Sequence, residues 1–275
     1  MIKIITDSSA DLPNEMVEKY DITIVPLTVS IEGKDYLEKI DISPQEFFKK
    51  MFSTNELPKT SQPSPASFAE AYSKFSEDTE LLVLTISSGL SGTYQSAILG
   101  KDLTDANVTV FDTLAGSVGH GLLIIKAAEL ANQGYTMEKI IEELLEYREK
   151  MNFLIVLNTL ENIVKGGRLS KFQGSLAKLL NIKVIAERIN EGKVGIVEKI
   201  RGKKKLQSRV LDLIEERGSD LSQVTFGISH TGNLEEAETL KQDIIQRFQP
   251  KDVIITYMGA TMGTYAGKDG MIISF

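Results

Sequence analysis

Cysteine and tryptophan are absent from the 275 residues, and histidine occurs only twice, as His120 and His230. A chain without cysteine forms no disulfide, carries no thiol nucleophile and offers no thiolate to a metal. Two histidines are too few for a multi-histidine site, so we expect no metal. Every apolar run is shorter than the ~18 residues of a membrane span, and the first residues show no signal-peptide pattern. From these absences we expect a cytoplasmic protein without a transmembrane segment.

Aromatic residues and positive charge are also scarce. The aromatic content is 7% and the formal net charge is −7. Proteins that bind nucleic acid stack bases on aromatic side chains and attract phosphates with positive charge. The composition therefore argues against nucleic acid as a partner, although it leaves room for a small basic patch.

The first half of the sequence alternates short apolar runs with segments of helical periodicity. Strand-like runs lie at 2–5, 81–86 and 108–111, and the longest predicted helices span 117–132 and 137–150. This alternation is typical of a parallel, doubly wound α/β sheet.

Local signals add detail to this half. Residues 22–31, ITIVPLTVSI, predict a strand, and Pro26 indicates that the strand is irregular or lies at a sheet edge. The segment SPQEFFKKMF at 43–52 predicts a helix with proline in its first turn and a capping box. Asp11 is expected to cap a helix that begins near Pro13.

The second half reads differently because two β-branched runs, IKVIAERI and VGIVEKI, are joined by NEGK at 190–193, which is a hairpin signal. Helices near 204–217 and 234–248 and three further strands, VTFGIS, VIITY and GMIISF, complete this part. Hairpins combined with two helices indicate an α+β domain with a mixed, mostly antiparallel sheet. We therefore expect two domains, 1–150 and 151–275.

Two clusters of hydroxyl residues are the first candidate site. In TISSGLSGTYQSA, residues 85–97, Ser91, Gly92 and Thr93 follow a buried strand and precede a helix. Backbone N–H groups at a helix start lack an intrahelical partner, and together with the helix dipole they favour an anion. KTSQPSP at 59–65 also precedes a helix. Each cluster is compatible with a plain capped turn, and the two together are compatible with one anion site.

Catalytic and nucleotide motifs do not fit the chain. It contains no G-x-x-x-x-G-K-[ST] and no G-x-G-x-x-G after a strand, so no nucleotide cofactor is expected. The nucleophile elbow G-x-S-x-G is incomplete at Ser91 and at Ser117, where alanine replaces its first glycine. A serine-dependent esterase that uses Ser117 or Ser91 with His230 is nevertheless an alternative to a binding protein.

Two basic segments contrast with the acidic background: KGGRLSK at 165–171 and RGKKK at 201–205. A positive patch can attract an acidic protein partner or a phosphorylated ligand. The same residues can equally form a solvated charged surface. A regulatory module that binds an acidic partner through Arg201 and the lysines at 203–205 is therefore a further alternative.

The order of these segments resembles that of the DegV family of bacterial fatty-acid-binding proteins. The similar segments are DSSADLP, KTSQPSP, SSGLSGTYQSA, KGGRLS, RGKKK and a glycine-rich GT-x-x-G before the last strand, spread over residues 3–275. The resemblance implies two α/β domains with a long-chain fatty acid, such as palmitate or oleate, in a tunnel between them. It also implies a non-catalytic carrier, with a fatty acid kinase subunit as a candidate partner.

The resemblance further implies which residues hold the ligand. Hydroxyls and amides of the TSQP and SGLSGT motifs would bind the carboxylate, with the terminal glycine-rich segment and the strand-end histidine completing the network. The implied ligand-binding residues are Thr60, Ser61, Ser91, Gly92, Thr93, Thr264, Tyr265 and His230. Arg168, Arg201 and Lys203 are the implied candidates for docking of the kinase, and the two arginines are alternatively candidates for positioning the phosphorylated product.

One position departs from the family pattern. Family members usually carry histidine in a G-T-H-x-G-P-G segment, whereas GTYAGKDG has Tyr265 at that place. A phenol can donate the same hydrogen bond but does not become cationic near neutral pH. The acyl chain needs an apolar tunnel, and residues 47–52, FFKKMF, are candidates either for its lining or for the core.

Overall fold

The computed structural model describes residues 1–54, 56–170 and 182–275. The apolar runs of the first half form a four-stranded sheet in the order β2-β1-β6-β7, in which each neighbouring pair is parallel. Its strands are β1 (Ile2–Asp7), β2 (Thr23–Val25), β6 (Glu80–Thr85) and β7 (Asn107–Asp112). The predicted parallel sheet is confirmed.

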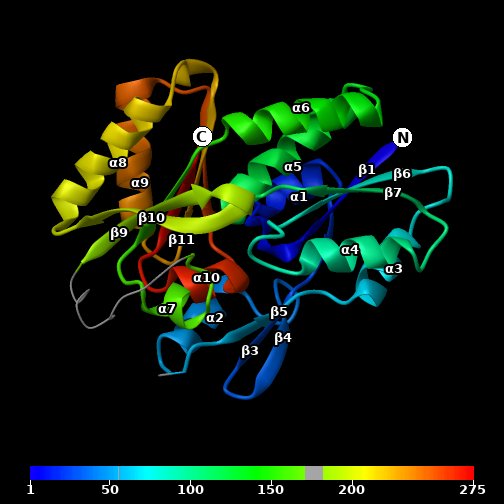
Figure 1. The fold of residues 1–275 in the computed structure, drawn as a ribbon, viewed down its shortest axis with the longest axis horizontal. Coiled ribbons are helices and arrows are strands. Elements are labelled where there is room, and N and C mark those ends of the chain that lie inside the picture. Colours follow the sequence, from blue (N-terminus) through cyan, green and yellow to red (C-terminus); the bar gives the residue numbers. More distant parts are fainter. Residues whose placement is uncertain (55, 171–181) are drawn as a thin grey trace.

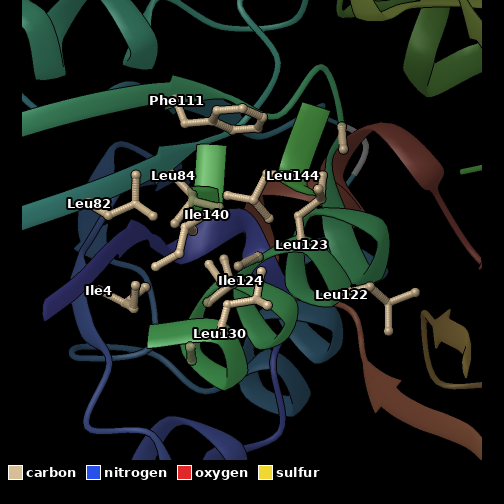
Figure 2. Close-up of a cluster of buried hydrophobic side chains, with 14 of the residues drawn as sticks. Ile4, Leu82, Leu84, Phe111, Leu122, Leu123, Ile124, Leu130, Ile140 and Leu144 are labelled. Atoms are coloured by element: carbon tan, nitrogen blue, oxygen red, sulfur yellow. The ribbon is translucent and has the colours of Figure 1, made fainter. Parts of the chain in front are cut away.

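Helices cover both faces of this sheet (Figure 1). Helices α5 (Ser117–Asn132) and α6 (Met137–Lys150) pack on the face that carries Ile4, Leu82 and Leu84, together with the short α1 (Asn14–Lys19). Figure 2 shows this cluster of buried side chains. Helices α3 (Pro65–Tyr72) and α4 (Thr93–Lys101) cover the opposite face, which carries Ile5 and Val83. Successive residues of a strand point to opposite faces, so apolar runs in β1 and β6 bury side chains on both sides.

The segment 22–31, which was predicted as one strand, is divided between the parallel sheet and a separate antiparallel sheet. The chain leaves the parallel sheet after Val25, and Pro26 and Leu27 lead it into β3 (Thr28–Ile31) of an antiparallel sheet in the order β4-β3-β5. The other two strands are β4 (Lys34–Leu37) and β5 (Lys59–Ser61). Proline has no backbone N–H to donate to a ladder, which explains why the single strand of the prediction is wrong.

The predicted helix starts have mixed outcomes. Helix α2 (Pro44–Met51) begins with the expected capping box of Ser43 and Glu46. The Asp11 cap is wrong, because Pro13 stands at the start of α1 and receives no side-chain cap. The Asp11 carboxylate is buried instead and accepts hydrogen bonds from residues far along the chain.

The second half forms a six-stranded sheet in the order β10-β9-β8-β13-β11-β12. Within the described residues only β11 and β12 pair in parallel, and the other neighbours are antiparallel. The strands are β8 (Phe153–Leu157), β9 (Lys183–Ile189), β10 (Lys193–Ile200), β11 (Thr225–His230), β12 (Asp252–Tyr257) and β13 (Met271–Ser274). The mixed, mostly antiparallel sheet and its β9–β10 hairpin are therefore confirmed.

The two faces of the six-stranded sheet have different partners. Helices α8 (Lys203–Arg217) and α9 (Leu234–Phe248) cover one face. The other face packs against α5, α7 (Glu161–Lys165) and α10 (Ala260–Ala266), and so it lies toward the first half of the chain. Three 3₁₀ turns complete the described elements: η1 (Ser8–Ala10), η3 (Asn190–Gly192) and η4 (Leu221–Gln223).

The predicted division after residue 150 falls in the short connection between α6 and β8. Helix α5 packs on strands of both sheets, so the two halves share an extensive contact. The boundary itself stays a prediction. In the described parts of the chain, no helix combines the length and the apolar character required to cross a membrane.

Candidate functional site

A cavity of about 360 Å³ lies between the two halves of the chain. The first half contributes parts of β5, the loop after β6 and the residue Leu27. The second half contributes strands of the six-stranded sheet, Arg168 and residues of α10. Ligand pockets of proteins typically have volumes of ~300–1,000 Å³, so the cavity is large enough for a small molecule.

Hydroxyl groups from the two predicted clusters line the same end of this cavity. Thr60 and Ser61 belong to β5, and Ser91 with Gly92 immediately precedes α4. The Ser91 hydroxyl lies 2.9 Å from Thr93 Oγ1 and accepts a hydrogen bond from the Thr93 amide at 3.3 Å. Because α4 begins here, its first N–H groups and its dipole add to the hydroxyls as a site for negative charge.

Gln62 holds the two clusters together. Its amide nitrogen donates to the Gly92 carbonyl at 3.2 Å and to the Ser96 hydroxyl at 2.8 Å. A Cβ atom at position 92 would collide with the Gln62 carboxamide, so this close approach requires glycine. Gln62 also lines the cavity. Its role was missed from the sequence, and the available signal was its place directly after Thr60 and Ser61.

Tyr265 and Arg168 bring the second half of the chain to the same end. The Tyr265 hydroxyl lies 2.6 Å from Thr60 Oγ1. The Arg168 guanidinium lies over the Tyr265 ring, 4.9 Å from its centroid, and donates to the Gly166 carbonyl at 2.7 Å and the Leu90 carbonyl at 3.3 Å. Among the described residues that line the cavity, Arg168 is the single charged side chain. It was predicted as a docking residue, and the structure places it in the cavity wall.

Apart from Thr261, the remaining wall is apolar. It consists of aliphatic side chains from both halves and one methionine: Leu27, Ile86, Leu90, Ile155, Leu157, Ile163, Val194, Met262, Ala266 and Ile272. A second cavity of about 40 Å³ shares Leu90, Ile155, Val194, Met262 and Ile272 with the first and extends to Gly116 and Phe153. The combined space therefore has hydroxyl and amide groups at one end and a mostly aliphatic wall over the rest of its length, with Phe153 and Arg188 in the wall of the smaller cavity.

Residues 47–52 do not line this space. Phe47, Phe48 and Met51 are buried in a separate cluster with Val29 and other side chains of the three-stranded sheet. Of the two alternatives for FFKKMF, the structure supports core packing.

Three of the predicted ligand-binding residues lie outside the cavity wall. Thr93 is fully buried beneath Ser91. Thr264 is also buried, and its hydroxyl donates to the Ala260 carbonyl of its own helix at 2.8 Å. His230 packs against the Tyr257 ring at a centroid distance of 4.9 Å, and its Nδ1 accepts a hydrogen bond from the Gly232 amide at 3.2 Å. The structure therefore brings Thr60, Ser61, Ser91, Gly92 and Tyr265 together, but not these three.

Ser117 and Ser91 also do not form the hydrogen-bonded pair with His230 that a serine-dependent esterase requires. Ser117 Oγ lies 2.5 Å from Asp11 Oδ2, to which it donates, and 2.7 Å from Ser229 Oγ. His230 follows Ser229 on β11, where successive side chains alternate between faces, and it makes no hydrogen bond with Ser117 or Ser91. Burial lowers the pKa of His230, which reflects its surroundings and not a paired nucleophile.

The basic segment at 201–205 lies on the surface at the start of α8. Arg201 and the three lysines are exposed, and Lys203 forms an ion pair with Glu236 at 2.7 Å. None of them lines the cavity. In the other basic segment, residue 171 lies outside the described residues.

Comparisons with known proteins agree on one family. The sequence profile of the family described as "Uncharacterised protein, DegV family" matches residues 1–275. A DegV domain-containing protein of Listeria innocua is 37% identical over 268 residues, which cover 97% of this chain and 95% of that protein.

Solved structures of two family members have the same fold. A DegV family protein from Thermus thermophilus, reported for its fatty acid binding, has a TM-score of 0.92 and 30% identity, with 100% of this chain and 99% of that chain covered. A DegV family protein from Ruminococcus gnavus, refined with vaccenic acid, has a TM-score of 0.92 and 29% identity, again with 100% and 99% covered.

Proposed function

Because the chain belongs to the DegV family, we propose that it binds one long-chain fatty acid, such as palmitate or oleate, in the cavity between its two sheets. The fatty acids associated with its structural relatives support this ligand class. The observation that carries the proposal is the amphipathic character of the cavity, in which hydroxyl and amide groups gather at one end and mostly aliphatic side chains form the rest of the wall.

The head group would lie between Thr60, Ser61, Ser91 and Gly92. Moving a carboxylate from water into a protein interior costs several kcal/mol of free energy when it finds no hydrogen-bond partners there. The carboxylate therefore needs a dense set of donors. The hydroxyls and the start of α4 supply them from one side, and Tyr265 supplies a phenolic hydroxyl from the other. The Arg168 guanidinium adds positive potential at the same end.

The acyl chain would extend from this end along the aliphatic wall toward the smaller cavity. Met262 lines both spaces, and its terminal methyl would lie 2.9 Å from a Cβ atom at Gly116. Burial of methylene groups contributes ~0.8 kcal/mol each, so the tail would supply most of the binding free energy. A flexible methionine between the two spaces can adapt to different tails.

We further propose that the protein acts as a carrier without catalysis of its own and presents the fatty acid to a separate kinase subunit. The exposed cations at 201–205 are the proposed docking surface for that partner. Their position at the N-terminal end of α8, where the helix dipole disfavours cations, supports a role other than stability.

The first test is the ligand itself. Mass spectrometry of an organic extract of the purified protein is expected to find close to one equivalent of long-chain fatty acid. After delipidation, the protein is expected to bind added palmitate or oleate with the same stoichiometry by isothermal titration calorimetry. A protein that releases no fatty acid and binds neither ligand would refute the proposal.

A matched pair of serine variants locates the head group. Ser91→Ala removes one hydrogen bond from a neutral hydroxyl to the charged carboxylate and is expected to weaken fatty-acid binding roughly tenfold or more. Ser88→Ala in the same loop is the control, because Ser88 is exposed and does not line the cavity. Equal affinities for the two variants would remove Ser91 from the head-group site.

A further inference from the structure

A group of buried carboxylates lies beside the cavity without lining it. Asp7, Asp11 and Glu38 are exposed by 1% or less. Asp7 and Asp11 belong to the DSSADLP motif, which follows β1, and Glu38 follows β4. Charged residues are rarely buried this completely unless they bind specific partners, so each carboxylate needs an explanation.

Glu38 joins η1 to the start of α10. Its Oε1 accepts a hydrogen bond from the Thr261 amide at 2.8 Å, and its Oε2 accepts from the Thr261 hydroxyl at 2.7 Å and the Ser8 hydroxyl at 2.6 Å. The Ser8 hydroxyl in turn accepts from the Leu27 amide at 2.9 Å. Both Thr261 and Leu27 line the cavity.

Asp11 binds the residue that precedes α10. Its Oδ1 accepts from the Gly259 amide at 2.6 Å, and its Oδ2 accepts from the Ser117 hydroxyl. A Cβ atom at position 259 would lie 2.5 Å from Glu38 Oε1 and 2.8 Å from Asp11 Oδ1. Glycine at this position therefore allows both carboxylates to reach the start of the same helix.

Asp7 makes a similar contact with residues 86–92, the loop between β6 and α4 that carries Ser91. Its Oδ2 accepts from the Ile86 amide at 2.7 Å, and Ile86 is the first residue of that loop to line the cavity. Its Oδ1 accepts from the Ser9 amide at 3.0 Å, which fixes η1. The DSSADLP motif is thus bonded to three separate segments of the cavity wall.

We propose that Asp11 and Glu38 are positioning residues for the fatty-acid site: they hold the start of α10 against η1 and thereby set the position of Tyr265 and Thr261 in the cavity wall. This inference rests on the proposed fatty-acid binding. Neither carboxylate lines the cavity, so an effect on affinity must pass through the segments that they bind: α10 for both residues and, for Glu38, also Ser8 and Leu27.

The chemistry of the contacts supports this role. Hydrogen bonds from amides and hydroxyls to a carboxylate are about twice as strong as neutral ones, and they are directional. Helix α10, ATMGTYA, contains one glycine and two threonines and directly follows Gly259, and such a sequence has little helical stability of its own. Its placement therefore depends on contacts with the rest of the protein, and the two carboxylates grip its first residues.

Substitutions of Glu38 test the proposal in the full-length, delipidated protein. Glu38→Gln preserves size but replaces one acceptor oxygen by a donor that faces two hydroxyl donors. It is expected to weaken binding of oleate about fivefold, and Glu38→Ala, which leaves three donors without an acceptor, about tenfold or more. Asp11→Asn is expected to weaken binding about threefold, because the amide oxygen can still accept from Gly259.

A stability control separates positioning from general damage. Leu213→Ala removes a buried side chain of α8, which covers the sheet face away from the cavity. It is expected to lower the melting temperature at least as much as Glu38→Gln while leaving the dissociation constant for oleate unchanged. An equal loss of affinity in Leu213→Ala would overturn the proposal.

A double-mutant cycle asks whether Glu38 acts through Tyr265. If Glu38 positions Tyr265, then Tyr265→Phe should cost much less affinity in the Glu38→Gln background than in the wild-type protein. Additive changes in the logarithm of the dissociation constant would overturn the proposal, as would unchanged or tighter binding by both Glu38 variants. A wild-type protein that binds no fatty acid would instead refute the function proposed above, so the two failures are distinguishable.

Discussion

At the scale of one residue, the buried carboxyl group of Asp11 shows that holding the cavity wall in place reduces the stability of the fold when the group is ionised. Burial, together with the neighbouring charge of Glu38, raises the pKa of Asp11 from 3.8 to about 7, although Lys39, Ser117 and Gly259 act in the opposite direction. Burial also raises the pKa of Glu38. Folding therefore favours the protonated form of each acid relative to the unfolded chain, and ionised Asp11 reduces the stability of the fold.

The pH dependence of stability follows from the sign of this shift. The contribution of Asp11 to folding is fully present below pH 3.8, where the group is protonated in both states, and is lost as the pH rises through about 7. Asp11→Asn removes this dependence. Relative to wild type, the free energy of unfolding of the variant is expected to rise by roughly 3 kcal/mol between pH 5 and pH 8.

Urea denaturation of both proteins at the two pH values measures this difference. Asp78→Asn serves as the control, because Asp78 is exposed and forms no hydrogen bond with the described residues. It should change stability by a similar small amount at both pH values. A difference between Asp11→Asn and wild type that does not vary with pH would contradict the prediction.

At the level of single residues, the sequence predicted the position of the site more reliably than it predicted which residues form it. The hydroxyls at 60–61 and 91 were found because they form polar clusters beside apolar runs. Thr264 was predicted with Tyr265, but adjacent residues on a helix point in directions about 100° apart, so only one of them faces the cavity. The partners of Asp11 lie more than 100 positions away, at 117 and 259, and no local pattern reveals them.

At the scale of one element, the charges in the first turn of helix α8 conflict with the helix dipole. Its first turn contains Lys203, Lys204 and Lys205 and no acidic residue. The positive end of the helix dipole disfavours this arrangement. Only Lys203 has a carboxylate partner among the described residues, namely Glu236.

Reversal of one of these charges should stabilise the protein. Lys204→Glu is expected to raise the free energy of unfolding by ~0.5 kcal/mol at low ionic strength, because an anion in the first turn interacts favourably with the dipole. The measurement is chemical denaturation at 10 mM and 500 mM salt, and the gain should shrink at the higher salt.

A lysine at the opposite end of another helix provides the control. Lys101 lies in the last turn of α4, where a cation is favourable, so Lys101→Glu is expected to lower stability by a similar amount. The same sign of change in both variants would contradict the dipole argument.

Local sequence patterns also explain why some elements are predicted better than others. The long helices α5, α6, α8 and α9 were predicted to within one residue, because α6, α8 and α9 have apolar residues at helical spacing and α5 is a long, largely apolar segment without proline. Helix α10 was not predicted, since its glycines and threonines resemble a loop. Its close contacts explain the glycines: a Cβ at Gly263 would collide with the Phe48 ring, as one at Gly259 would with the two carboxylates.

At the scale of the whole molecule, the cavity belongs to both halves of the chain. Hydroxyls of the first half and Tyr265 of the second meet at one end, and aliphatic side chains of both halves form the rest. A ligand in this position would add contacts across the junction between the two sheets. The parallel and the mixed sheet were both predictable from strand–helix alternation and hairpin signals, whereas the cavity depends on how they pack together.

Ligand removal should therefore lower stability measurably. At a free concentration of palmitate 100 times the dissociation constant, the folded state is expected to gain ~2.7 kcal/mol. For a chain of this size the melting temperature should rise by several degrees, at ~2–4 °C per kcal/mol. Differential scanning calorimetry of the delipidated protein with and without palmitate measures the shift.

The control ligand is acetate, which has the carboxylate but no tail. Because most of the binding free energy is assigned to buried methylene groups, acetate at the same concentration should leave the melting temperature unchanged. A shift of equal size with acetate would show that the tail contributes nothing.

The position of β13 in the six-stranded sheet has a consequence for synthesis of the chain on the ribosome. This strand is the last element of the sequence, yet it lies between β8 and β11, inside the sheet, and its residue Ile272 lines the cavity. The parallel sheet is complete by residue 112, and domains that lie early in a chain can fold during translation. The second sheet has to wait with an open central position until residue 274 has left the exit tunnel. A newly made chain therefore acquires its complete cavity only after β13 has been synthesised.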